Sequence, residues 1–328
     1  MRRICLLLSC LVSVISLLGS AAVSAQGFPA KSISIVVPYP PGSTSDLIPR
    51  LLAPLLSQAL AVPVLVENLA GANGALGAQK VEKGGTEELQ ILMAPTGVLA
   101  INQFLYTKLA YDPEKAFEPV INLASTPNLI VVNKDVPAAS LQELIQLAKN
   151  RPGSITYASA GIGSTSHLCG EMLRAFGQAP VVHVPYRGPA PAKLAVLSGE
   201  VSMICDNLSN VIQEVRTGRL KAIALTNSQR TPAAPEIPTL RESGVPELAK
   251  YEVDNWYALA APAGTPRDVI LKIAADAKRV LALPDIRQRM AAAGLDPMTS
   301  TPEEQATYLK ADIAKFKRVI DFAGVKPG

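Results

Sequence analysis

The chain has 328 residues, a formal net charge of +4 at pH 7 and an aromatic content of 5%. This length allows two hydrophobic cores of ordinary domain size, and the low aromatic content favours α/β layers built from alanine, valine and leucine. Lysine and arginine are scattered along the chain, which argues against nucleic acid as a partner. The two histidines, His167 and His183, do not lie in a ligand-spaced motif, so we expect no metal site.

The first residues have the pattern of a cleaved signal peptide. Arg2 and Arg3 precede an apolar run over residues 4–18, and Val23-Ser24-Ala25 fits the small residues of a cleavage site. A membrane anchor needs about 20 uninterrupted apolar residues, and glycine and serine at positions 19 and 20 interrupt this run. We therefore expect residues 1–25 to be a signal peptide and the mature chain to lie in the periplasm.

Short runs of β-branched residues then alternate with segments of helical apolar periodicity. This alternation is typical of parallel sheets covered on both faces. The first part of the chain predicts three strands, each followed by a helix, with strands at 32–37, 63–67 and 88–93 and helices at 45–60, 74–82 and 98–104. These elements form one α/β unit.

A second unit repeats the same rhythm. Its predicted strands are 129–132, 155–158, 181–184 and 201–205, and its predicted helices are 141–149, 165–176, 190–197 and 210–217. The run 220–225 leads to a last region with a strand at 256–260 and helices at 267–281 and 302–322. Because these last helices lack a sheet of their own, we expect them to complete the first unit.

The expected organisation is therefore two domains connected twice. Residues 27–126 with 227–328 would form the first domain, and residues 127–226 the second. The chain would cross between them near 124–128 and again near 226–230. In open α/β sheets the binding crevice lies beyond the carboxyl ends of the strands, where loops lead into helix N-termini.

Two such loops carry residues suited to binding an anion. Residues 38–46 join the first strand to its helix and contain Gly42-Ser43-Thr44-Ser45, and residues 159–167 occupy the corresponding place in the second unit. Free N–H groups and the dipole at a helix start attract negative groups, although ordinary helix capping explains the same residue types. Two facing helix N-termini predict a carboxylate clamp.

Nucleotide-binding patterns are missing from both loops. No Gly-Lys-Ser/Thr follows either loop, and Gly71-Ala72-Asn73-Gly74 does not complete a dinucleotide fingerprint. We expect no cofactor.

The mature chain resembles the tripartite tricarboxylate transporter receptors, the Bug or TctC type of periplasmic solute-binding protein. The matching stretches include residues 35–46, 64–68, 71–77, 111–113, 157–168, 183–188, 205–207 and 261–266. The resemblance implies a type II periplasmic binding protein, with two open α/β domains, a ligand cleft between them and two hinge crossings. It also implies a monomeric receptor without enzymatic activity.

The ligand implied by the resemblance is a small organic carboxylate: a dicarboxylate, hydroxy acid, amino acid or aromatic acid. Its partner would be the membrane components of a tripartite tricarboxylate transporter, or alternatively a sensor kinase. Carried over by position, the ligand-binding residues would be Tyr39, Pro41, Gly42, Ser43, Thr44, Asp46, Thr96, Ser159, Ala160, Gly163, Ser164, Thr165, Ser166, Tyr186 and Asp206.

Asp206 has two interpretations. It could be the N-cap of the helix that follows the strand 201–205. If it faces the pocket instead, it would repel a bare anion and could accept a hydrogen bond from a hydroxyl or ammonium group.

An exported hydrolase is the main competing class. Ser164 or Ser166 with His167 would be its nucleophile and base, but neighbours at one helix start seldom align for that chemistry, and no G-x-S-x-G elbow occurs.

The cysteine pair Cys169 and Cys205 remains after the leader is removed. Sequence leaves open a disulfide or two buried thiols, and we expect the thiols to be free.

We predict cleavage after Ala25, because small residues occupy the −3 and −1 positions there. N-terminal sequencing of protein released from the periplasm should start at Gln26. An intact Met1 on that protein would contradict the assignment.

Overall fold

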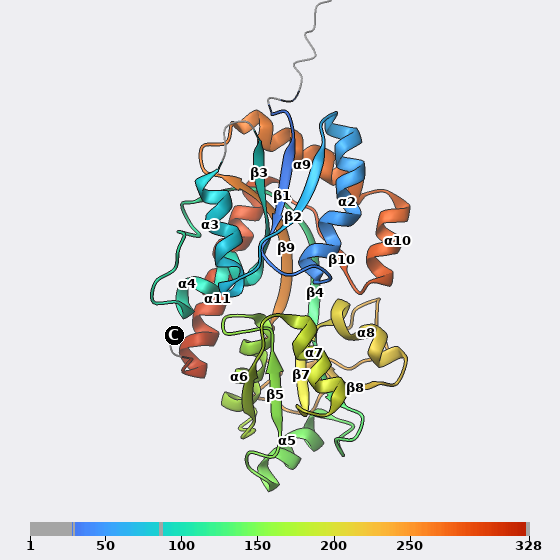
Figure 1. Cartoon of the computed structure of the whole chain (residues 1–328). Helices are drawn as coiled ribbons and strands as arrows, with labels where there is room; N and C mark the ends of the chain where they lie inside the picture. Colours follow the sequence, from blue (N-terminus) through green and yellow to red (C-terminus); the bar gives the residue numbers. More distant parts are fainter. Residues whose placement is uncertain (1–27, 29, 85–87, 326–328) are drawn as a thin grey trace, which may run out of the picture.

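The computed structural model describes residues 28, 30–84 and 88–325. The predicted signal peptide lies outside the described residues. Within them, no helix combines the length and apolar character that a membrane span requires. Two α/β lobes lie one above the other in Figure 1, with the strand β4 (Phe117–Asn133) running through both.

The first lobe is built on the strand order β2-β1-β3-β9-β4, with β10 paired to β4. Strand β1 is parallel to β2 and β3, whereas β9 is antiparallel to β3 and β4. The bounds of these strands are β1 Ile33–Val37, β2 Val64–Asn68, β3 Leu89–Pro95, β9 Asp254–Pro262 and β10 Asp296–Pro297.

Helices cover both faces of this sheet because alternate side chains of its strands point to opposite sides. One apolar cluster joins Ile33, Ile35 and Val37 to α2, α9 and α10, and the other joins Val36 and Leu92 to α3, η2 and α11. The helices are α2 Thr44–Leu60, α3 Ala75–Lys83, η2 Gly97–Ile101, α4 Asn102–Leu105, α9 Arg267–Leu281, α10 Pro284–Ala292 and α11 Pro302–Ala323.

The second lobe has the strand order β4-β7-β5-β6, with β8 also paired to β4. Helices α5 and α6 share one apolar cluster with this sheet, and α7 and α8 share another on the opposite face. The bounds are β5 Thr156–Ser159, β6 Val182–Pro185, β7 Met203–Asn207, β8 Leu220–Leu225, α5 Leu141–Asn150, α6 Thr165–Ala175, α7 Pro189–Ser198 and α8 Leu208–Arg216.

The first crossing between the lobes is a strand rather than a loop. Residues 117–127 of β4 pair with β9, and residues 128–133 pair with β7 and β8. The sequence predicted only the second half of this strand. Register shifts follow Pro119 and Asn122, and such irregularities interrupt the alternating pattern by which a strand is recognised.

The return crossing lies later in the chain than residues 226–230. Ala234 and Ile237 belong to an apolar cluster of the second lobe, and the ring of Tyr251 stacks on Phe176 of that lobe at 3.7 Å. Thr226 donates its hydroxyl to the carbonyl of Val253 at 2.7 Å. The chain therefore re-enters the first lobe at the start of β9, directly beside the middle of β4.

The expectation that Cys169 and Cys205 are free thiols is wrong, because the two form a disulfide with a Cα–Cα distance of 6.1 Å. Cys169 lies on α6 and Cys205 on β7, and both side chains are buried in the same apolar cluster. A separation of 36 residues in sequence says nothing about this juxtaposition, which arises only when α6 packs on the sheet.

We predict that reducing this disulfide lowers the free energy of unfolding by about 2–4 kcal/mol, because the cross-link closes a long loop in the unfolded chain. Denaturant titration of the mature protein with and without reductant measures the difference. Thiol counting on denatured, unreduced protein should find none, and finding two would contradict the disulfide.

Candidate ligand-binding cleft

A narrow cleft, partly open to solvent, lies where the two lobes face each other. The strand ends and helix starts of both lobes line it: Tyr39, Ser43, Thr44, Ser45, Pro95, Gly97, Ala160, Ser164, Thr165, Ser166, Pro189, Asp206, Asn207, Asn210, Asn255 and Tyr257. Of the described residues that line the cleft, none is a lysine or arginine, and Asp206 is the one carboxylate.

Eight of the residues predicted for the site line this cleft: Tyr39, Ser43, Thr44, Ala160, Ser164, Thr165, Ser166 and Asp206. The structure places the other seven behind it or beside it: Pro41, Gly42, Asp46, Thr96, Ser159, Gly163 and Tyr186. Hydrogen bonds account for the positions of all of these residues except Pro41.

Asp46 holds the first loop together rather than facing the cleft. Its Oδ2 accepts from the backbone N–H of Gly42 at 2.9 Å, and its Oδ1 accepts from Arg50 at 2.8 Å and Asn68 at 2.9 Å. Burial opposes ionisation, but these hydrogen bonds outweigh it and lower the pKa of Asp46. The N–H group of Gly42 is therefore already used.

Thr96 also acts behind the cleft wall. Its hydroxyl accepts from Trp256 N at 2.8 Å and donates to Trp256 O at 3.2 Å, which ties the end of β3 to β9. Its neighbours Pro95 and Gly97 are the residues that reach the cleft.

The loop 159–167 also forms hydrogen bonds with its own helix start. Ser164 caps α6 by accepting from His167 N at 3.2 Å, and Gly163 N points at His167 Nδ1 at 3.5 Å. The N–H groups of Thr165 and Ser166 lie in the first turn of α6, where no intrahelical acceptor exists. Thr44 and Ser45 have the same position in α2, and all four residues line the cleft, so their N–H groups are the candidate donors to a bound anion.

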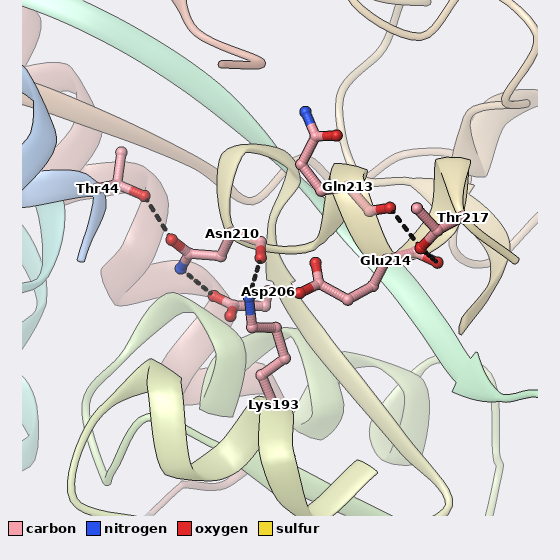
Figure 2. A network of polar contacts seen from close by, with 7 residues as sticks. All are labelled: Thr44, Lys193, Asp206, Asn210, Gln213, Glu214 and Thr217. Carbon is pink, nitrogen blue, oxygen red and sulfur yellow. Dashed lines mark hydrogen bonds and ion pairs between the residues drawn. The ribbon is translucent and has the colours of Figure 1, made fainter. Parts of the chain in front are cut away.

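Side-chain hydrogen bonds connect the lobes across the cleft. Thr44 Oγ1 lies 2.7 Å from Ser209 Oγ and donates to Asn210 Oδ1 at 2.9 Å, as Figure 2 shows for Asn210. Asn255 Nδ2 donates to Thr165 Oγ1 and to Asn207 Oδ1, each at 2.6 Å. The described structure therefore has the two lobes in contact.

Sequence reasoning missed the amide and phenol groups of this network. Asn207 and Asn210 follow a predicted strand end, so the rule that ligands bind beyond strand ends could have found them. Asn255 and Tyr257 come from β9, far along the chain, and no local pattern marks them. Asn207 Nδ2 donates to Tyr257 Oη at 2.6 Å.

Asp206 faces the cleft from the end of β7. Its Oδ1 accepts from Asn207 N at 2.8 Å and Asn210 Nδ2 at 3.0 Å. Burial raises the pKa of Asp206 to about 6, although these hydrogen bonds and the nearby Lys193 oppose the shift. The N-cap position of α8, which we considered for Asp206, belongs to Asn207.

The serine and histidine side chains do not form the arrangement of a hydrolase. Ser164 Oγ donates to the carbonyl of Gly161 at 2.6 Å and lies 2.8 Å from Ser166 Oγ. A different pair forms below the loop, where buried Ser159 lies 2.6 Å from His183 Nε2. Burial, and next the neighbouring His167, lower the pKa of His183 to about 4, so it is a weak base.

A second, wider hollow continues from the cleft. Tyr39 and Ala160 border both, and the second hollow is also lined by Tyr106, Tyr186 and Arg187. Tyr186 donates its hydroxyl to Glu200 at 2.9 Å. Tyr186 thus lines the second hollow and not the cleft itself.

Two lobes that share a strand, with two helix N-termini facing each other across a cleft, define a two-lobed solute-binding protein. The sequence profile of the tripartite tricarboxylate transporter family receptor matches residues 48–325. The chain belongs to this family, and the fold is that of the type II periplasmic binding proteins.

Relatives and solved structures agree with this assignment. The chain is 31% identical over 308 residues to Protein BugT of Bordetella pertussis, with 94% of each chain covered. It resembles the periplasmic binding protein BugD with a TM-score of 0.84 and 31% identity, covering 92% of this chain and 100% of that one. It also resembles a Rhodopseudomonas palustris protein solved with adipate, with a TM-score of 0.87 and 30% identity, covering 92% of this chain and 100% of that one.

A further solved relative is MatC from Rhodopseudomonas palustris with bound malate. Its TM-score to this chain is 0.80 at 30% identity, covering 90% of this chain and 100% of that one. Family members are thus solute-binding receptors of the periplasm.

We predict that Thr44→Val weakens contact between the lobes, because it removes the hydroxyl that bonds to Ser209 and Asn210 across the cleft, at a cost of about 0.5–1.5 kcal/mol per hydrogen bond. Small-angle scattering should give a larger radius of gyration than for the unchanged protein. Thr307→Val is the control, since that hydroxyl is exposed and donates within α11. Equal radii for both variants would contradict a role of Thr44 in closure.

Proposed function

We propose that this chain is exported to the periplasm, captures a small carboxylate-bearing solute in the cleft and delivers it to the membrane components of a tripartite tricarboxylate-type transporter. It would act as a monomer and without catalysing a reaction. The observation that carries the proposal is the pair of facing helix N-termini, whose N–H groups at 44–45 and 165–166 have no intrahelical acceptor.

A carboxylate suits this arrangement for two reasons. Its two oxygens can accept from both helix starts at once, and each helix dipole adds about 0.3–1 kcal/mol for a nearby negative group. The complexes of related proteins with adipate and malate support a carboxylic acid as the ligand here.

The site residues in this proposal fall into two groups. Thr44, Ser45, Thr165 and Ser166 would hold the carboxylate through backbone N–H groups. Tyr39, Ser43, Ala160, Ser164 and Asp206 would surround the rest of the solute, and Tyr186 would border a longer one in the outer hollow. Gly42, Asp46, Thr96, Ser159 and Gly163 would support the loops from behind, and Pro41 would shape the first of them.

The direct experiment is to identify and measure the ligand. Mass spectrometry of small molecules released from natively purified mature protein would be followed by calorimetry with succinate, malate, aspartate, adipate and benzoate. Binding of at least one acid is expected. If no acid binds and a released molecule has no carboxyl group, the proposed function is wrong.

We predict that Thr165→Pro reduces affinity for the bound acid at least tenfold while the fold is retained. Proline deletes a cleft-facing N–H worth on the order of 1.5–3 kcal/mol when it is bonded to a charged group. Thr165 is the first residue of α6, a position where proline is well tolerated. The preceding Ser164 has an extended backbone, with φ −73° and ψ 155°, which is compatible with a following proline.

Thr165→Val is the matched control, because it removes the hydroxyl that accepts from Asn255 but keeps the N–H group. Calorimetry should show a much smaller loss for valine than for proline. Circular dichroism checks the fold of both variants. Equal affinities of the two variants would place the carboxylate elsewhere.

A further inference from the structure

One buried carboxylate oxygen in the cleft has no hydrogen-bond partner in the described structure. Asp206 is 4% exposed and lines the cleft, and its Oδ2 is the unpartnered atom. Its Oδ1 already accepts from Asn207 N and Asn210 Nδ2. Because both donors point at Oδ1, a proton on this carboxyl group is expected on Oδ2.

The charged and titratable groups around Asp206 do not supply a free cation. Lys193 from α7 donates to Asn210 O at 2.8 Å and to Glu214 Oε1 at 2.9 Å, so the carboxylate of Glu214 balances its charge (Figure 2). Tyr257 from β9 is the other neighbour, and burial raises the pKa of its phenol, which therefore stays neutral. An anion that enters the cleft meets Asp206 without a compensating positive side chain.

Two carboxylates in one small site without a cation do not both ionise readily, because like charges raise each other's pKa. We propose that binding of the carboxylate solute is coupled to the uptake of one proton, which is held between Asp206 Oδ2 and the solute. Asp206 in its protonated form then donates a hydrogen bond to the solute instead of repelling it. This inference rests on the proposed function of the cleft.

The proton needed for this coupling is readily available near neutral pH. Burial raises the pKa of Asp206 to about 6, so a minor fraction of the free protein is protonated at pH 7. The form that binds is the protonated one. Affinity is therefore greatest well below pH 6 and falls as the pH rises through 6.

The test uses succinate, malate and aspartate, which share one carbon skeleton and differ in a hydrogen, a hydroxyl and an ammonium group. For succinate, the dissociation constant should rise about fiftyfold from pH 6 to pH 8, because the protonated fraction of Asp206 falls from about 0.5 to about 0.01. Calorimetry at pH 8 in buffers of different ionisation enthalpy should show uptake of about one proton.

Asp206→Asn is the decisive variant. The amide keeps an acceptor at the position of Oδ1 and places an N–H donor at the position of Oδ2, so it imitates the protonated acid. It should bind succinate with an affinity that changes little over this pH range and should take up no proton. Asp135→Asn is the control, because Asp135 is an exposed carboxylate of the second lobe that pairs with Lys134 and does not line the cleft, so this variant should keep the pH dependence.

The possible outcomes distinguish failure of the proton coupling from failure of the proposed function. If succinate does not bind, the tightest acid of the five-acid panel takes its place. Affinity that is independent of pH in the unchanged protein overturns the coupling but leaves the proposed function intact. Preference for aspartate or malate, lost in Asp206→Asn, also overturns it, since an ionised Asp206 would then accept from the solute. Failure of every acid to bind either protein at any pH rejects the proposed function itself.

Discussion

The pairing of β4 with both lobes is the constraint on which the rest of the structure depends. Its first part pairs with β9 and its second part with β7 and β8, so one strand fixes where each sheet ends relative to the other. Pro127 pairs with Asp254 at the last position of the first lobe, and Asn128 pairs with Asn207 at the first position of the second. The cleft forms beside this junction.

Recognition of an anion without a cation follows from that geometry. The strands deliver two helix starts to the cleft from opposite lobes, and backbone N–H groups there carry partial positive charge that needs no lysine or arginine. Such donors compensate a charge less completely than an ammonium or guanidinium group does. The protonation state of Asp206, the acid inside the cleft, therefore matters more than it would in a site lined by cations.

The sequence predicted the parts of the molecule that depend on local pattern. Helices 267–281 and 165–176 and most strands lie within a few residues of their predicted places, because periodic apolar residues determine them. The sequence did not predict helix α10 or the first half of β4. In β4 the reason is that Pro119 and Pro127 interrupt the run, and proline within a run argues against a strand. Asp46 and Thr96 point away from the cleft and Asn255 lies in it, and these positions depend on contacts between distant segments, which no local sequence pattern shows.

The disulfide constrains the second lobe internally but does not connect the two lobes. Cys205 directly precedes Asp206, and Cys169 lies one turn into the helix whose first turn presents Thr165 and Ser166. The cross-link therefore fixes the helix start and the acid relative to each other inside the second lobe. The lobes themselves are joined at the cleft by side-chain hydrogen bonds and at the junction by two crossings of the backbone. Hydrogen bonds of this kind exchange with water at small net cost, whereas a covalent bond does not. We therefore expect opening and closing to occur at the junction beside β4, while the second-lobe side of the cleft keeps its geometry.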